Sequence, residues 1–222
     1  MCHDLSVTEA FFVDVWSDVV CPFCYLGSRM FAEALEGFEH REVVVIRHRA
    51  FELDPNAATS YDISLNELVA KKYAIPVDRA RSMNERLEAQ ALTFQMTWSM
   101  RDAKPTNTFD AHRLIALAQS QGVGDQMVAR LFRAYFSDGR RLGDHDTLSA
   151  LAAEVGVIGV DELWHGDAHA LDVRRDERAA QELGISGVPS IVLDGKLMVV
   201  GAQGAEAMLD VLRRAWARRS AT

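Results

Sequence analysis

The order of apolar patterns along the chain is the feature that most constrains its fold. The run Phe11–Trp16 is short and rich in aromatic and β-branched residues, so it predicts a buried strand. Helical apolar spacing follows over Tyr25–Phe38. The next run, Glu42–Phe51, predicts a second strand, which we expect to be central because its Val-Val-Val-Ile stretch is unbroken. Strand, helix and strand in this order indicate a βαβ unit with parallel strands.

The middle of the chain indicates a separate helical unit. From residue 64 to residue 166 the apolar spacing is helical. A further helix pattern at Ala168–Leu183 leads into two strand patterns around Asp194-Gly195, a strong hairpin signal, and a last helix pattern covers Ala205–Ala217. This order predicts an α/β protein with a thioredoxin fold and an all-helical domain inserted after the second strand. The thioredoxin-like domain would be discontinuous, over residues 10–63 and 167–219, around the insertion 64–166.

Composition excludes several classes of protein. A chain of 222 residues that is 49% hydrophobic and 25% charged is globular, and is neither disordered nor collagen-like. Its net charge of −8 disfavours binding to nucleic acid, which rests on neutralising phosphates. No stretch approaches the roughly 18 apolar residues of a membrane span, and the first ten residues lack the basic start of a secretory signal. We therefore expect a cytoplasmic protein with neither nucleic-acid nor membrane partners.

The cysteines need individual interpretation, because three are too few and of the wrong parity for a disulfide scaffold. Cys21-Pro22-Phe23-Cys24 lies between a strand pattern and a helix pattern, where Pro22 suits the first helical turn. A thiol at this place faces unpaired backbone N–H groups, which lower its pKa. We expect Cys21 to attack and the more buried Cys24 to resolve. The competing interpretations are a zinc half-site and two buried hydrophobic cysteines. No second CxxC exists, so no metal is expected. Cys2 is interpreted as an exposed bystander.

A second motif lies directly before the third strand pattern. In Gly187-Val188-Pro189-Ser190, the proline removes one ladder donor and can hold a cis peptide bond. Taken alone, the motif would be an ordinary turn into a strand. In the predicted fold, Pro189 packs against Cys21 and leaves the backbone of Val188 free to pair with an extended substrate.

Two further patterns are assigned to ordinary structure. His165 and His169 have the spacing of a helical metal pair, but Gly166 lies between them and no third ligand is evident. We also expect an apolar series in the insertion to belong mainly to the core: Met83, Leu87, Phe94, Met96, Trp98 and Met100.

With these motifs in place, the chain resembles the DsbA-like thioredoxin-fold oxidoreductases of the FrnE subgroup, which are related to 2-hydroxychromene-2-carboxylate isomerases. The similar segments span nearly the whole chain in order: Ser17–Gly27, Phe51–Pro55, Asn107-Thr108 with Ala111–Leu114, Leu131–Phe136, Gly187–Ser190 and Gly201–Gln203. The resemblance implies that Cys21 is the attacking cysteine, Cys24 the resolving one and Pro189 the cis-proline. It also implies that Asn107 and His112 face the active-site groove from the insertion.

The resemblance implies thiol–disulfide exchange on a protein or small-molecule thiol or disulfide, with Pro22, Phe23 and Val188 contacting the substrate. Its redox group would be a Cys21–Cys24 disulfide, with no separate cofactor and with glutathione as a candidate co-substrate. The related isomerases carry serine where this chain has Cys21, so the intact pair favours exchange. Two alternatives stay open: a glutathione-dependent isomerase or transferase, and a chaperone-like module that holds peptides. The direction of exchange, the physiological substrate and the choice between monomer and homodimer also stay open.

Overall fold

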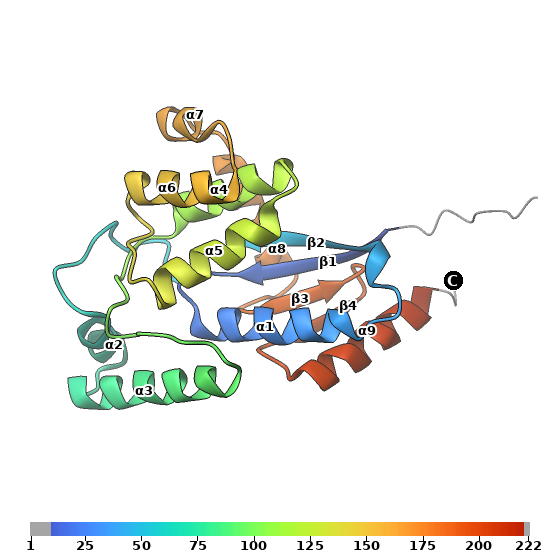
Figure 1. Ribbon diagram of the computed structural model, residues 1–222, viewed down its shortest axis with the longest axis horizontal. Coiled ribbons are helices and arrows are strands. Elements are labelled where there is room, and N and C mark those ends of the chain that lie inside the picture. Colours follow the sequence, from blue (N-terminus) through green and yellow to red (C-terminus); the bar gives the residue numbers. More distant parts are fainter. Residues whose placement is uncertain (1–9, 220–222) are drawn as a thin grey trace, which may run out of the picture.

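A computed structural model describes residues 10–219 and shows a four-stranded mixed sheet flanked by helices (Figure 1). The strands lie in the order β2-β1-β3-β4. β1 runs parallel to β2 and antiparallel to β3, which pairs antiparallel with β4. Their bounds are Phe11–Ser17 for β1, Val44–Ala50 for β2, Ser190–Leu193 for β3 and Leu197–Val200 for β4. This is the predicted thioredoxin fold.

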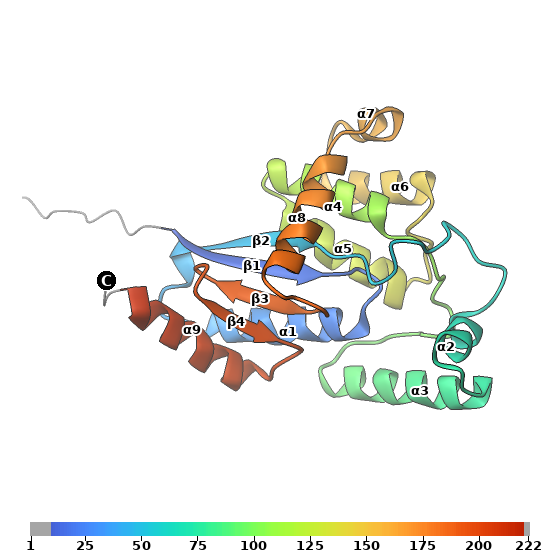
Figure 2. The same ribbon diagram turned by 180° about the vertical axis from the view of Figure 1, so that it is seen from behind.

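The helices form two groups. α1 (Pro22–Glu36) and α9 (Ala205–Arg219) cover one face of the sheet, and α8 (Ala170–Glu182) crosses the other face (Figures 1 and 2). The rest lie between β2 and α8 in sequence, and they cap the end of the sheet where α1 begins: α2 (Leu65–Tyr73), α3 (Val77–Thr93), α4 (Phe109–Ser120), α5 (Gly124–Phe136), α6 (His145–Val155) and α7 (Val160–His165). In the described part of the chain, no helix is long and apolar enough to cross a membrane.

The two faces of the sheet are built differently because alternate side chains of a strand point to opposite faces. On the α1 and α9 face, Phe11 and Val13 are fully buried in an apolar core with Leu212. On the α8 face, the buried carboxylate of Asp14 accepts a hydrogen bond from Arg49 Nε at 2.7 Å. Arg49 also donates to Asp176 of α8 at 3.0 Å. These ion pairs connect α8 to the sheet and give both buried carboxylates, Asp14 and Asp176, an arginine partner.

The prediction that the second strand is central is wrong, because β2 is an edge strand. The insertion covers that edge: the backbone N–H of His48 donates to Gln119 Oε1 of α4 at 2.7 Å, and His48 Nε2 lies 2.6 Å from Asp125 Oδ1 of α5. A covered edge tolerates apolar residues that an open edge would not. Part of the apolar run is not strand at all, since Arg41–Val43 forms a 3-10 turn.

An aromatic stack joins the insertion to α1. The ring of Tyr25 on α1 stacks on Phe132 of α5 and on Trp98, with ring centroids 4.9 and 5.4 Å away. Trp98 is buried, as are Met96 and Met100 from the same predicted core series. The prediction is wrong for Met83, which lies on α3 with 40% of its surface exposed. The first turn of α1 is thus enclosed between the sheet and the insertion.

The core of the insertion offers a test of this packing. Leu131 on α5 is fully buried, whereas Leu171 on α8 is 78% exposed. We expect Leu131→Ala to lower the free energy of unfolding by about 2–5 kcal/mol, because it leaves a cavity in a close-packed interior. The control, Leu171→Ala, should stay within about 0.5 kcal/mol of the unaltered protein. Urea unfolding followed by circular dichroism measures both, and equal losses would contradict this packing.

Candidate active site

The first turn of α1 places the two cysteines. Cys21 is the N-cap residue of α1, with φ −88° and ψ 115°, and Pro22 is the first helical residue. The Cys21 sulfur accepts a hydrogen bond from the backbone N–H of Cys24 at 3.4 Å. A helix N-terminus leaves such N–H groups without partners inside the helix, so a sulfur at this position takes the place of a capping oxygen. The predicted start of the helix at the CxxC motif is confirmed.

The loop before β3 supplies the facing surface. The peptide bond between Val188 and Pro189 is cis, and the Cys21 thiol donates to the Val188 carbonyl oxygen at 3.7 Å. Gly27 allows Pro189 to pack closely against α1, because a Cβ at Gly27 would lie only 3.1 Å from Cγ of Pro189. The structure therefore brings Cys21 and Cys24 to the loop that carries Val188 and the cis-proline Pro189.

Both thiols are free and both are shielded from solvent. Cys21 is 4% exposed and Cys24 is 2% exposed. Phe23, between them in sequence, is 48% exposed and offers an apolar side chain beside the pair.

The pair is electrostatically asymmetric. The side chain of Cys24 donates a hydrogen bond to the Cys21 sulfur, and together with the backbone N–H of Cys24 this lowers the pKa of Cys21 in spite of burial. Burial raises the pKa of Cys24 well above its ordinary value, and donation to Cys21 raises it further. Cys21 is thus the thiol that ionises first, while Cys24 keeps its proton.

A buried acid lies behind the two thiols. The carboxylate of Asp18 is 1% exposed, and its Oδ2 accepts a hydrogen bond from the backbone N–H of Leu53 at 2.8 Å. Its Oδ1 lies 3.6 Å from Nε2 of His112, whose side chain is 3% exposed. The sequence analysis gives no role to Asp18. The signal for a buried acid beside the thiols is an aspartate three residues before Cys21 in an otherwise apolar segment. The family resemblance predicts that His112 faces the active-site groove, whereas the structure places the buried His112 side chain against Asp18.

Asn107 links the start of α4 to the segment that follows β2. Its Oδ1 accepts from the backbone N–H of Phe109 at 2.9 Å at the start of α4, and its Nδ2 donates to Glu52 at 3.3 Å. Glu52 is itself buried and paired with Arg174 at 2.6 Å. Substrate binding by Asn107 stays a prediction. Cys2, interpreted above as a bystander, lies outside the described residues.

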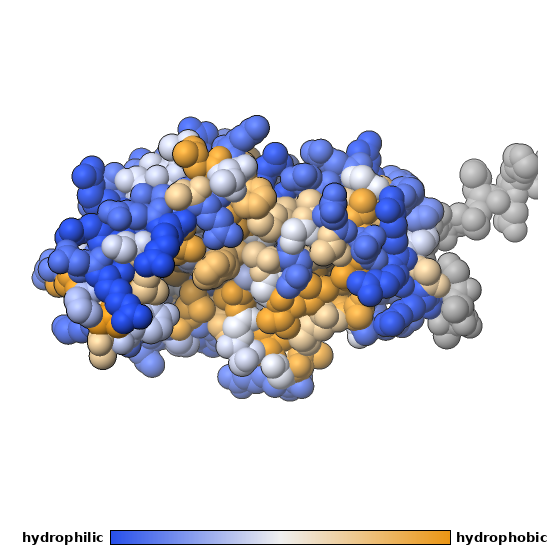
Figure 3. Space-filling model, turned by 90° about the horizontal axis from the view of Figure 1, so that it is seen from below, coloured by the Kyte–Doolittle hydropathy of each residue, from blue (hydrophilic) through white to orange (hydrophobic). Residues whose placement is uncertain are grey.

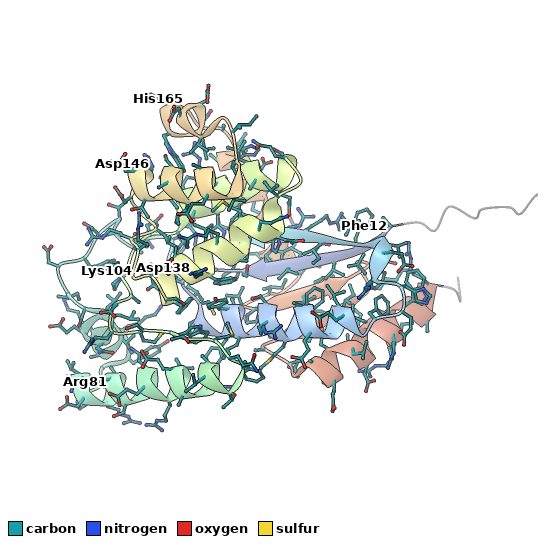
Figure 4. All side chains as sticks on the ribbon, viewed as in Figure 1. Phe12, Arg81, Lys104, Asp138, Asp146 and His165 are labelled. Atoms are coloured by element: carbon teal, nitrogen blue, oxygen red, sulfur yellow. The ribbon has the colours of Figure 1, made fainter. Side chains whose placement is uncertain are left out.

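His165, one of the two histidines considered as a helical metal pair, is remote from this site, and His169 is hydrogen-bonded to Asp172. His165 lies at the outer end of the molecule on α7, far from the first turn of α1 (Figure 4). Among residues 10–219, no group of three or more His, Cys, Asp or Glu side chains is arranged to hold a metal ion.

Comparison with known proteins shows the family to which the chain belongs. Residues 12–213 match the family described as the DSBA-like thioredoxin domain. The chain belongs to this family. A structure described as a probable DsbA oxidoreductase from Streptomyces coelicolor is 36% identical, with a TM-score of 0.88, and the match covers 93% of this chain and 90% of that one.

Two further relatives of the DSBA-like chain are more distant. The uncharacterized protein YwbO of Bacillus subtilis (strain 168) is 29% identical over 86% of this chain and 90% of its own. The cytosolic disulfide reductase DsbM from Pseudomonas aeruginosa shares the fold with a TM-score of 0.65 at 19% identity, over 91% of this chain and 97% of its own. All three matches span both the sheet and the insertion.

Two substitutions of Cys24 test whether its side chain lowers the pKa of Cys21. Cys24→Ser keeps a side-chain donor for the Cys21 sulfur, whereas Cys24→Ala removes it. Because this hydrogen bond is the largest cause of the lowered pKa, we expect Cys21 to have a higher pKa in Cys24→Ala than in Cys24→Ser. The rate of iodoacetamide alkylation against pH reports this pKa, since only the thiolate reacts. The same pH midpoint in both variants would contradict the assignment.

Proposed function

We propose that this protein is a thiol–disulfide oxidoreductase that works through Cys21 and Cys24. The observation that carries the proposal is the asymmetric pair at the start of α1. The Cys21 thiol has a lowered pKa and accepts hydrogen bonds from the side chain and the backbone N–H of Cys24, whose own thiol has a raised pKa. One thiolate that attacks and one protonated thiol held beside it are the two components that exchange through a mixed disulfide requires.

The reaction then has two steps. The Cys21 thiolate attacks one sulfur of a substrate disulfide, the substrate S–S bond breaks, and the first substrate sulfur leaves as a thiolate. Cys24 loses its proton and attacks the Cys21 sulfur, which releases the second substrate thiolate and forms the Cys21–Cys24 disulfide. Two electrons pass from the protein to the substrate. Run in reverse, the same steps oxidise a substrate dithiol.

The substrate would bind along the loop before β3. The Val188 backbone lies next to Cys21, so an extended peptide or a glutathione-like thiol can pair with it, while Pro22 and the exposed Phe23 offer apolar contact. Hydrophobic side chains gather in a band across the middle of the lower face, between the α3 end and the α9 end of the molecule (Figure 3). One structure of the reductase DsbM contains glutathione, which supports glutathione as a candidate co-substrate in the cytoplasm.

Single cysteine substitutions test the proposal. We expect Cys21→Ser to abolish reduction of insulin and of a model disulfide, because it removes the attacking sulfur. Cys24→Ser should accumulate a covalent mixed disulfide with the substrate, visible as added mass on the intact protein, because attack proceeds and resolution does not. Cys2→Ser is the matched control and should retain full turnover.

The outcomes separate the proposal from its alternatives. Full turnover by Cys21→Ser would refute exchange through this pair. Turnover that needs glutathione and survives Cys24→Ser would identify an isomerase or transferase. Suppression of aggregation that survives loss of both cysteines, without any exchange activity, would identify a peptide-holding module.

A further inference from the structure

We propose that this protein binds a small apolar carboxylate, an alkyl chain with one anionic head, in a cleft between the sheet and the inserted helices. The cleft has a volume of about 770 Å³, which lies within the range of small-molecule sites. Cys24 contributes to its lining. Cys21, Val188 and Pro189 do not. The site is therefore separate from the surface proposed for the exchange substrate, and its occupation does not depend on the exchange reaction.

The cleft lies between two apolar cores of the described chain. One core packs α1 and α9 against the sheet, and its members Phe31 and Ile191 line the cleft. The other core is formed mainly by the insertion, and its members Val128 and Phe132 line the cleft from α5. The helices α1 and α5 that form these walls are seen in Figure 1. A ligand with an apolar body would fill the space that separates the two cores.

The floor of the cleft is apolar sheet surface that no helix covers fully. Phe11, Val13 and Val15 alternate along β1 and therefore point to the same face. Phe11 and Val13 are fully buried in the core with α1 and α9, whereas Val15 is only partly buried. Ile46 on the edge strand β2 is partly buried as well, and it lines the cleft together with Val15. Transfer of such surface from water to an apolar ligand is favourable in proportion to the area covered.

The segment that closes one side of the cleft carries a strained backbone. Gln95, shortly after α3, lines the cleft with a φ of 60°, a left-handed conformation that residues other than glycine rarely adopt. Such conformations persist where the surrounding structure holds them, and they cluster at ligand sites. Met96 is buried and lines the same side, and its flexible thioether side chain adapts to the shape of an occupant. This side of the cleft is thus suited to alkyl chains of more than one length.

The shape of the cleft fits an alkyl chain better than a peptide. Its lining on α1 extends from Cys24 to Leu35, a distance of about 16 Å at the rise of an α-helix. The cleft opens on the face of the sheet, whereas the N–H and C=O groups of a strand point towards the neighbouring strands. An extended peptide would therefore find few backbone partners there. An alkyl chain needs none.

The charges at the cleft favour an anionic head. Two acids line the cleft, and both have a basic partner: Asp125 lies 2.6 Å from Nε2 of His48, and Asp138 pairs with Arg130 at 2.8 Å. Arg29 on α1 also lines the cleft and is exposed. Within residues 10–219 no hydrogen bond or ion pair involves its guanidinium group. A guanidinium group binds a carboxylate through two parallel hydrogen bonds, so Arg29 is the cation that the ligand head would meet.

Isothermal titration calorimetry of the full-length protein with decanoate and with decanol tests the site. The two probes share an alkyl chain and differ in charge. We expect one decanoate to bind per chain, with a negative heat-capacity change because apolar surface is buried. Decanoate should bind more tightly than decanol. Absence of decanoate binding, or equal affinity for the two probes, would overturn the proposal.

Two substitutions on facing walls fill the cleft. Ala32 on α1 and Ala129 on α5 are exposed and line it, so a tryptophan at either position takes up ligand volume without entering a core. We expect Ala32→Trp and Ala129→Trp each to weaken decanoate binding about tenfold or more, because the indole clashes with the bound chain. Ala153→Trp, at an exposed alanine of α6, is the matched control and should bind decanoate normally. Unaltered affinity in both cleft variants would contradict this location.

Arg29→Gln tests the anionic head. We expect it to weaken decanoate binding about fivefold, the upper end for an exposed ion pair, and to leave decanol binding unchanged. Arg175→Gln, at an exposed arginine of α8, is the matched control and should change neither affinity. If Arg29→Gln prefers decanoate over decanol as strongly as the unaltered protein does, the pairing with Arg29 is wrong.

The remaining outcomes concern other places and other occupants. Phe23→Ala and Cys21→Ser alter the exchange surface and not the cleft, so both should bind decanoate like the unaltered protein. Because Cys21→Ser should do so without any exchange activity, failure of one proposal is distinguishable from failure of the other. Loss of decanoate binding in Phe23→Ala would place the ligand beside the thiols and overturn the proposal. Binding of reduced, carboxymethylated α-lactalbumin that decanoate does not displace, and that both tryptophan variants abolish, would identify a polypeptide site and overturn it as well.

Discussion

The hydrogen bonds that end at the Cys21 sulfur organise this site. A helix must offer its first N–H groups to some acceptor, and here the acceptor of the Cys24 N–H is a thiol rather than the usual side-chain oxygen. The interaction that begins α1 therefore also favours the Cys21 thiolate, together with the larger effect of the hydrogen bond from the Cys24 side chain. Any change that shifts the first turn of α1 alters the helix cap and the reactivity of the thiol together.

The position of α1 depends on contacts with both parts of the protein. On one side Gly27 allows Pro189 to approach closely, which sets the Val188 carbonyl beside Cys21. On the other side Tyr25 stacks on Phe132 of the insertion. Enclosure between the two excludes water from Cys24 and makes its pKa high. The raised pKa of Cys24 thus depends on its burial beneath the insertion. The same insertion also brings the imidazole of His112 to within 3.6 Å of Asp18.

The sequence predicts the fold well because its strongest signals are local. The hairpin at Asp194-Gly195 is confirmed, and both residues have the positive φ, 51° and 67°, that such a turn requires. The start of α1 at Cys21 is local in the same sense. By contrast, the place of β2 at the sheet edge depends on cover by α4 and α5, which lie far along the chain. The contact between Asp18 and His112 joins the segment after β1 to α4, which lies far along the chain, and no periodicity in the sequence indicates it.

The proposed function requires Cys21 and Cys24 to form one reversible two-electron couple. The most direct measurement is equilibration of the full-length protein in a series of glutathione redox buffers, followed by acid quenching, alkylation of free thiols and mass analysis of the intact chain. We expect a single transition, in which Cys21 and Cys24 form an intramolecular disulfide and both escape alkylation at the same buffer potential. Persistence of both free thiols across the series, or a stable glutathione adduct on Cys21 in place of the internal disulfide, would contradict it.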